Sequence, residues 1–169
     1  MDKFLDIYMK ALEVLITAML VAMVVLVFGN VAMRYGLNSG ITVSEELSRW
    51  LFVWVTFLGS IIAMRENSHL GSNFIVRMFG PGGRRAFLIL GRIAMIYICW
   101  LVFEGSREQT VINLSVSAPI TGMSMGAFYS SGMVFSVSGA LILLGDIYRL
   151  ARCAPDEIDR FLDETGEQA

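Results

Sequence analysis

The chain has 169 residues, of which 56% are hydrophobic and 17% are charged, and its formal net charge is −2. Soluble domains carry about 25% charged and roughly 45–50% apolar residues, so this composition favours a chain that is solvated partly by lipid. The nearly balanced charge argues against a nucleic-acid partner. Two cysteines and one histidine are too few for a disulfide framework or a structural zinc site. The composition therefore predicts a small multi-pass membrane protein.

Four hydrophobic segments approach the length of a membrane-spanning helix. A bilayer core about 30 Å thick requires roughly 20 helical residues. The expected spans are residues 11–33, 44–64, 86–103 and 125–145. The first apolar run is longer than the core of a signal peptide and no cleavage site follows it, so we expect a retained helix. The predicted fold is an all-α integral membrane protein with a single four-helix transmembrane domain over residues 1–153.

The distribution of lysine and arginine predicts the orientation of the chain. Such residues gather on the cytoplasmic side of a membrane. An inward N-terminus places eight of them inside, namely Lys3, Lys10, Arg65, Arg77, Arg84, Arg85, Arg149 and Arg152. The same orientation places three of them outside, namely Arg34, Arg49 and Arg107. We therefore expect both termini to be cytoplasmic.

The segments between and after the spans also carry patterns. Between the second and third spans, apolar residues recur at helical spacing at Leu70, Phe74, Ile75, Met78 and Phe79. This spacing predicts a short amphipathic helix at the inner membrane surface, ended by the Gly-Pro-Gly-Gly of residues 80–83. From about Glu104 to Ser124 we expect a polar outer connection that turns at Pro119 and Gly122. Residues 154–169 form an acidic cytoplasmic tail, which either packs on protein through a small apolar stripe or is solvated.

Ionisable side chains inside spans are costly and are therefore candidate functional residues. At the outer end the polar residues are Asn30, Arg34, Glu45, Glu46 and Arg49, followed directly by the interfacial aromatic Trp50. Asn30 and Arg34 share a helical face because they are four residues apart. Glu45 and Glu46 lie four and three residues before Arg49, within reach of its guanidinium. Two interpretations stay open: local pairs at the membrane surface, or a cluster that joins the first helix to the second or to another subunit.

Arg92 is the charged residue placed deepest in a predicted span, roughly 10 Å from the inner side. It either extends towards the inner surface or pairs with Glu13, which is expected at a similar depth. We favour the Glu13–Arg92 pair, as a structural link between helices. Small residues of the second span, Gly59, Ser60 and Ala63, are suited to close approach of another helix.

The sequence contains none of the residue patterns that catalysis or ion coupling requires. No acidic residue or histidine falls in the middle of a predicted span, where transporters usually place their coupling sites. No nucleophile–base pair, carboxylate dyad or phosphate-binding loop is recognisable. We therefore expect a chain that is not an enzyme and that holds no catalytic centre, cofactor or metal ion.

Residues 28–70 carry a set of short motifs that resembles one family. The motifs are Phe28-Gly29-Asn30-Val31, Arg34-Tyr35, Ser44-Glu45-Glu46-Leu47-Ser48-Arg49-Trp50, Thr56-Phe57-Leu58-Gly59 and Arg65-Glu66-Asn67-Ser68-His69-Leu70. They resemble the small membrane subunit, the DctQ- or SiaQ-like Q subunit, of tripartite ATP-independent periplasmic (TRAP) transporters. The length and four-span layout are similar too. Pro119 and Tyr129 match the family before the fourth span, whereas Ser124 stands where many relatives have proline.

The resemblance implies a subunit of a bacterial inner-membrane symporter. In such a complex a periplasmic binding protein delivers an organic acid, and a large multispan subunit imports it with the sodium gradient. The small subunit would brace the large one amid membrane lipid, and sialic acid is the substrate suggested, although no residue here encodes it. Two alternatives remain, a small four-helix membrane enzyme and a self-assembling exporter or channel. The first needs a cofactor pocket with a nucleophile or base, and the second needs a charged residue in mid-membrane.

Overall fold

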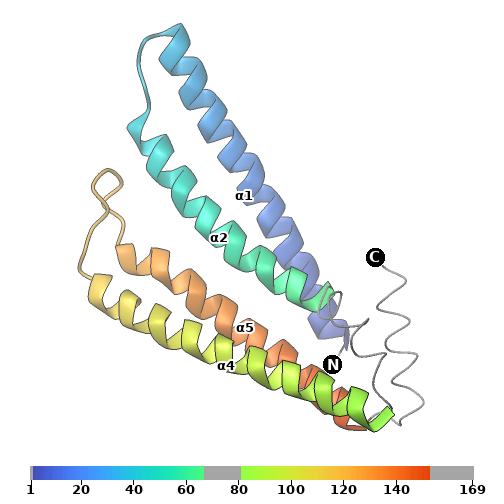
Figure 1. Ribbon diagram of the computed structural model, residues 1–169. Coiled ribbons are helices and arrows are strands. Elements are labelled where there is room, and N and C mark those ends of the chain that lie inside the picture. The colour runs from blue at the N-terminus through green and yellow to red at the C-terminus, as the bar shows by residue number, and fades with distance from the viewer. Residues whose placement is uncertain (1, 67–80, 153–169) are drawn as a thin grey trace.

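The computed structural model describes residues 2–66 and 81–152. These residues form four long helices: α1 (Asp2–Gly36), α2 (Thr42–Glu66), α4 (Pro81–Asn113) and α5 (Met125–Arg152). They are arranged as two helical hairpins, α1–α2 and α4–α5. The two hairpins separate from each other towards their connecting loops (Figure 1). Within the described ranges the β-structure is limited to an isolated bridge between Ser117 and Ser124. The prediction of an all-α fold is confirmed for these residues.

Each helix is long and apolar enough to cross a membrane. The candidate spans are Leu5–Gly36, Thr42–Arg65, Ala86–Asn113 and Met125–Tyr148. The shortest of these have 24 residues, or about 36 Å of helix, which exceeds a bilayer core of about 30 Å. By length and composition, the prediction of four spans is therefore confirmed. The predicted amphipathic helix at residues 70–79 and the acidic tail at 154–169 lie outside the described residues.

The third span is longer than the hydropathy of the sequence indicates. α4 continues from the predicted end at Phe103 to Asn113, so the connection between α4 and α5 is residues 114–124. The charged residues that end the apolar run pair along the helix: Arg107 Nε lies 3.2 Å from Glu104 Oε2. Pairs at this spacing stabilise a helix. Asn113 adds a 2.8 Å bond to the carbonyl oxygen of Gln109.

The spatial order of the helices differs from their order in the chain. α2 packs against both α1 and α5, and α5 packs most extensively against α4, so the helices follow the order α1, α2, α5, α4 (Figure 1). The shared core consists of Met9, Leu12, Leu58, Ile61 and Ile142. Tyr8 and Ser138 share a 2.9 Å hydrogen bond between their hydroxyls, which joins α1 directly to α5. One side of α2 is therefore covered by its two neighbours.

Glycines allow α5 to approach its neighbours closely. A Cβ at Gly126 would lie 3.2 Å from the carbonyl oxygen of Thr110, and one at Gly132 would lie 2.2 Å from Ser106 Oγ. At Gly126 the neighbours include backbone atoms, so a methyl group would require them to shift by a few tenths of an ångström, whereas at Gly132 the Ser106 hydroxyl would have to move aside. Gly59 of α2 is different, because nothing lies within 4 Å of its Cβ position. Gly59, one of the small residues predicted to permit close packing in α2, is therefore not used for it among the described residues.

Candidate functional site

Glu46, in the first two turns of α2, holds the α4–α5 connection. Its carboxylate accepts hydrogen bonds from the backbone N–H groups of Ile120 and Thr121, each at 3.1 Å. The Thr121 hydroxyl donates a further bond to Oε1. Bonds to an ionised carboxylate are stronger than neutral ones, and these join residues more than seventy positions apart. Glu46 therefore anchors this connection to the start of α2.

The connection that Glu46 holds is an ordered turn. The Ala118 N–H donates to the Met123 carbonyl oxygen at 2.7 Å, and the Gly122 N–H donates to the Ala118 carbonyl oxygen at 3.0 Å. Gly122 has φ +70°, a backbone conformation that glycine adopts without steric cost. The turn predicted at Pro119 and Gly122 is therefore present, and its backbone is paired within itself as well as with α2.

Polar contacts also join α1 to α2. The Ser44 hydroxyl, which is buried, donates to the Leu26 carbonyl oxygen at 2.6 Å. Asn30 Oδ1 accepts from the Ile41 N–H at 2.7 Å, so Asn30 links α1 to the segment before α2. Hydrogen bonds of this kind hold helices together where lipid offers no polar partner. Ser44 was not among the predicted site residues, although its hydroxyl in an apolar span was a usable signal.

The structure divides the predicted outer cluster into two sets. Arg34, Glu45 and Arg49 are exposed, whereas Glu46 is buried. Among the residues that the structure describes, no ion pair within 4 Å joins Arg49 to Glu45 or Glu46, although Arg49 lies close enough to Glu46 to interact with its charge. Within the described ranges, Arg34, Glu45 and Arg49 therefore make no hydrogen bond or close ion pair to another helix, whereas Glu46 does.

Trp50 lies inside the protein rather than at its surface. Its side chain is buried, and its ring meets that of Phe128 edge-on, with 5.7 Å between the ring centroids. Edge-to-face aromatic pairs are favourable beyond the area that they bury. Trp50 therefore contributes to the contact between α2 and α5, beside the turn that Glu46 holds.

Arg92 is buried between α4 and α5, with a relative exposure of 1%. Its Nε lies 3.9 Å from Asp146 Oδ2, and its Nη1 donates to the Leu88 carbonyl oxygen at 3.3 Å. The predicted pair with Glu13 is wrong, because Glu13 is exposed on α1 and the helix that covers α4 is α5. Asp146 directly follows the apolar run of the predicted fourth span, at the end expected on the inner side, and this position was the available signal for the pair.

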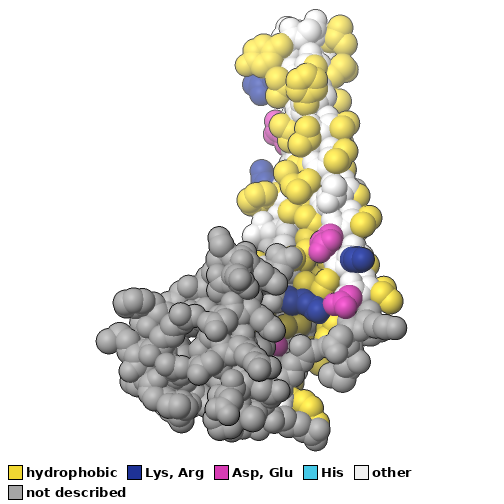
Figure 2. Space-filling model, turned by 90° about the vertical axis from the view of Figure 1, so that its right-hand side faces the viewer, with side chains coloured by type: hydrophobic (Ala, Val, Ile, Leu, Met, Phe, Trp, Pro, Cys, Tyr) yellow, Lys and Arg dark blue, Asp and Glu magenta, His cyan; other side chains and the backbone are white. Residues whose placement is uncertain are grey.

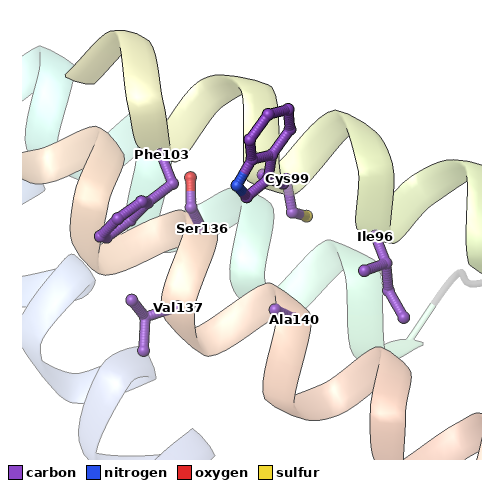
Figure 3. Close-up of a pocket in the computed structure, with 7 residues that line it drawn as sticks. Ile96, Cys99, Phe103, Ser136, Val137 and Ala140 are labelled. Carbon is purple, nitrogen blue, oxygen red and sulfur yellow. The ribbon is translucent and has the colours of Figure 1, made fainter. Parts of the chain in front are cut away.

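An apolar cavity of about 270 Å³ lies between α4 and α5. Figure 3 shows residues that line it, and the full set is Ile96, Cys99, Trp100, Phe103, Ser136, Val137 and Ala140. The Ser136 hydroxyl donates to the Gly132 carbonyl oxygen at 2.8 Å and is therefore already paired. The cavity lining offers no ionisable group that would bind an organic acid. In the described part of the chain, no group of three or more His, Cys, Asp or Glu residues is placed to hold a metal ion.

Residues 23–153 match the family described as tripartite ATP-independent periplasmic transporters, DctQ component. The chain belongs to this family. Two TRAP transporter small permease proteins of Haemophilus influenzae are similar to it. One is 39% identical over 135 residues, which cover 80% of this chain and 84% of that protein. The other is 32% identical over 142 residues, or 84% of each protein.

A third relative of this small TRAP permease subunit is more distant. It is the C4-dicarboxylate TRAP transporter small permease protein DctQ of Vibrio cholerae, 26% identical over 94 residues, which cover 56% of this chain and 40% of that protein. The family match spans the Glu46 anchor, the Arg92–Asp146 pair and the whole α4–α5 hairpin. The resemblance to DctQ-like small subunits that residues 28–70 carry is confirmed, and the four apolar helices fit a multi-pass protein of the inner membrane.

Proposed function

We propose that this chain is a scaffold subunit that braces the large membrane subunit of a TRAP transporter and does not itself bind the substrate. The observation that carries the proposal is the use of the buried charged groups. Glu46 holds a turn of the same chain, and Arg92 is paired across the α4–α5 contact. The described cavity between those helices is apolar. A transported anion requires polar groups at membrane depth, and these two residues are engaged in holding the fold.

The proposed complex follows from membership of a tripartite family. A periplasmic binding protein delivers an organic acid, and the large membrane subunit imports it with the sodium gradient while this chain braces it. No cofactor is proposed for this subunit, and it has no catalytic role. The Vibrio cholerae relative is named for C4-dicarboxylates, whereas sialic acid is the narrower substrate prediction for this chain.

The proposed orientation places both termini in the cytoplasm of a bacterium. It is supported by the excess of lysine and arginine at the chain ends and in the α2–α4 connection. The Glu46 anchor and the two hairpin turns would then face the periplasm. A single cysteine introduced at Ser117 in a cysteine-free variant should react with a membrane-impermeant maleimide in intact cells. Labelling only after the cells are opened would reverse the orientation.

The scaffold role is tested by co-expressing the full chain with an epitope-tagged large subunit. We expect the two subunits to purify together, and we expect uptake of the organic acid to be lost when this chain is omitted. Uptake by reconstituted vesicles that contain this chain as the single membrane protein would overturn the proposal, because the chain would then carry the substrate itself. Failure of the large subunit to co-purify would overturn it as well.

A further inference from the structure

α2 has one face that no described part of the chain covers. Leu58 and Ile61, on its opposite side, are buried in the core shared with α1 and α5. The uncovered residues recur every three or four positions and therefore lie on one helical face. They are Glu45, Arg49, Phe52, Thr56, Ser60 and Ala63, and we call this set the α2 free face. Ser60 is half-buried and the other five are exposed.

The α2 free face differs in composition from the other exposed surfaces. In the view from the side of α1, hydrophobic side chains cover most of the exposed length, and the charged side chains lie in the lower half of the view or along the left edge of the molecule (Figure 2). The large hydrophobic residues exposed on α1 include Val14, Val21, Val24, Val25 and Phe28, and those on α4 include Leu90, Ile93, Ile98, Trp100 and Leu101. On the α2 free face, the single large hydrophobic residue is Phe52, at 58% exposure. The α1 and α4 surfaces suit lipid chains, whereas the α2 surface is small and polar.

Small residues at membrane depth allow another helix to approach closely. Gly59, which adjoins the α2 free face, precedes Ala63 by four residues, and Thr56 precedes Ser60 by the same interval. The Thr56 and Ser60 hydroxyls donate to carbonyl oxygens of their own helix at 2.8 and 2.7 Å, so neither protrudes as an unpaired donor. Residues of α4 occupy the space beside Gly126 and Gly132 of α5, whereas the space beside Gly59 is open.

The outer end of the same face adds charge of both signs. Glu45 and Arg49 are exposed and four residues apart, and neither forms an ion pair within 4 Å in the part of the chain that the structure describes. Arg49 interacts electrostatically with Glu46 one turn away, but its exposed guanidinium remains accessible to another molecule. Anionic lipid headgroups would be attracted by Arg49 but repelled by Glu45 one turn away. A protein surface with a basic residue opposite Glu45 and an acidic residue opposite Arg49 satisfies both. The charge pattern therefore favours a protein occupant over lipid.

We propose that the α2 free face docks a transmembrane helix of the large subunit. That helix carries small residues opposite Gly59 and Ala63 and complementary charges opposite Glu45 and Arg49. The inference rests on the proposed function, because it requires a large membrane partner. It assigns the contact to α2 and leaves the outward surfaces of α1 and α4 to lipid.

Site-specific photocrosslinking tests the location of the contact. Benzoylphenylalanine replaces Thr56 on the α2 free face, or Val24 on α1 or Ile93 on α4 as controls, in the full chain co-expressed with the epitope-tagged large subunit. We expect an adduct with the large subunit from position 56 and none from positions 24 and 93. An adduct from position 24 or 93 without one from 56 would overturn the proposal. A dimer of this chain, or no protein adduct from position 56, would also overturn it.

A matched pair of substitutions tests the close approach. Ala63 on the α2 free face and Ala94 on α4 are both exposed, so each is changed to leucine in turn. Overpacking an interface costs about 1–3 kcal/mol, so A63L should lower recovery of the large subunit by about fivefold or more, and A94L should leave it unchanged. Wild-type recovery with A63L would overturn the docking face alone. If the unchanged chain recovers no large subunit, the proposed function fails as well.

Discussion

Replacing Asp146 by alanine should destabilise the protein strongly, because Arg92 stays buried after its carboxylate neighbour is removed. The charged atoms of this pair are 3.9 Å apart. Two unit charges at about that distance attract by about 4 kcal/mol at an effective dielectric constant near 20. Removing one partner of a buried pair costs a similar amount, about 3–5 kcal/mol. We therefore expect D146A to lower the free energy of unfolding by about 3–5 kcal/mol.

The opposite replacement, Arg92→Met, should cost less. The Asp146 side chain that it leaves behind is 22% exposed and can stay hydrated, and methionine fills much of the space of the arginine stem. In the R92M background, D146A should therefore lose most of its effect. Non-additivity of this kind is the expected signature of a direct interaction.

Thermal unfolding of the purified full-length chain in detergent measures these effects. A change of 1 kcal/mol shifts Tm by about 2–4 °C in a chain of this size, so D146A should lower Tm by roughly 6–20 °C. The matched control is Glu13→Ala, because Glu13 is the residue that sequence depth alone would pair with Arg92, and it should leave Tm unchanged. If E13A lowered Tm as much as D146A, or if R92M and D146A were additive, the assignment of this pair would be refuted.

Two other contacts yield sharp predictions. Glu46→Ala should speed amide hydrogen exchange in the turn at residues 116–124, because the N–H groups of Ile120 and Thr121 lose their acceptor. The control Glu45→Ala should leave the exchange rate of this turn unchanged. Equal protection of the turn in both variants would contradict the anchoring role of Glu46. Gly126→Ala should lower the stability of the chain by about 1–3 kcal/mol, since the new methyl group meets backbone atoms of α4. The matched variant Gly59→Ala has open space, so it should not lower Tm and should raise it slightly, because alanine favours a helix over glycine. An equal loss in both variants would contradict the close α4–α5 packing.

The number and type of the elements were predictable because they depend on local properties of the chain. A run of apolar residues long enough to cross a bilayer must form a helix, since its backbone groups find no other hydrogen-bond partners in lipid. All four helices were predicted for that reason. The end of α4 was not, because the charges after Phe103 interrupt the hydropathy without interrupting the helix: Glu104 and Arg107 pair along it.

The motifs of residues 28–70 were also sufficient to predict the family, but they did not predict which contacts each polar residue makes. Asn30 and Glu46 hold segments of the chain together, while Arg34 and Arg49 stay exposed. Helical spacing placed Glu46 within reach of Arg49, yet its carboxylate is taken by the N–H groups of a distant turn. Sequence spacing describes contacts within one helix, and these bonds connect different elements.

The sequence by itself thus determined that the chain has four helices long and apolar enough to cross a membrane. It did not determine which helices are neighbours. Hydropathy predicts where a residue lies along the membrane normal, but not which helix lies beside it. Glu13 and Asp146 both fall near the expected inner ends of their spans, so hydropathy did not distinguish between them as partners of Arg92. Packing separates them, because α5 presents the glycines that let α4 approach while α1 packs on α2. The same packing leaves one small, polar face of α2 uncovered by the other described helices, a surface that depends on the order of the helices in space.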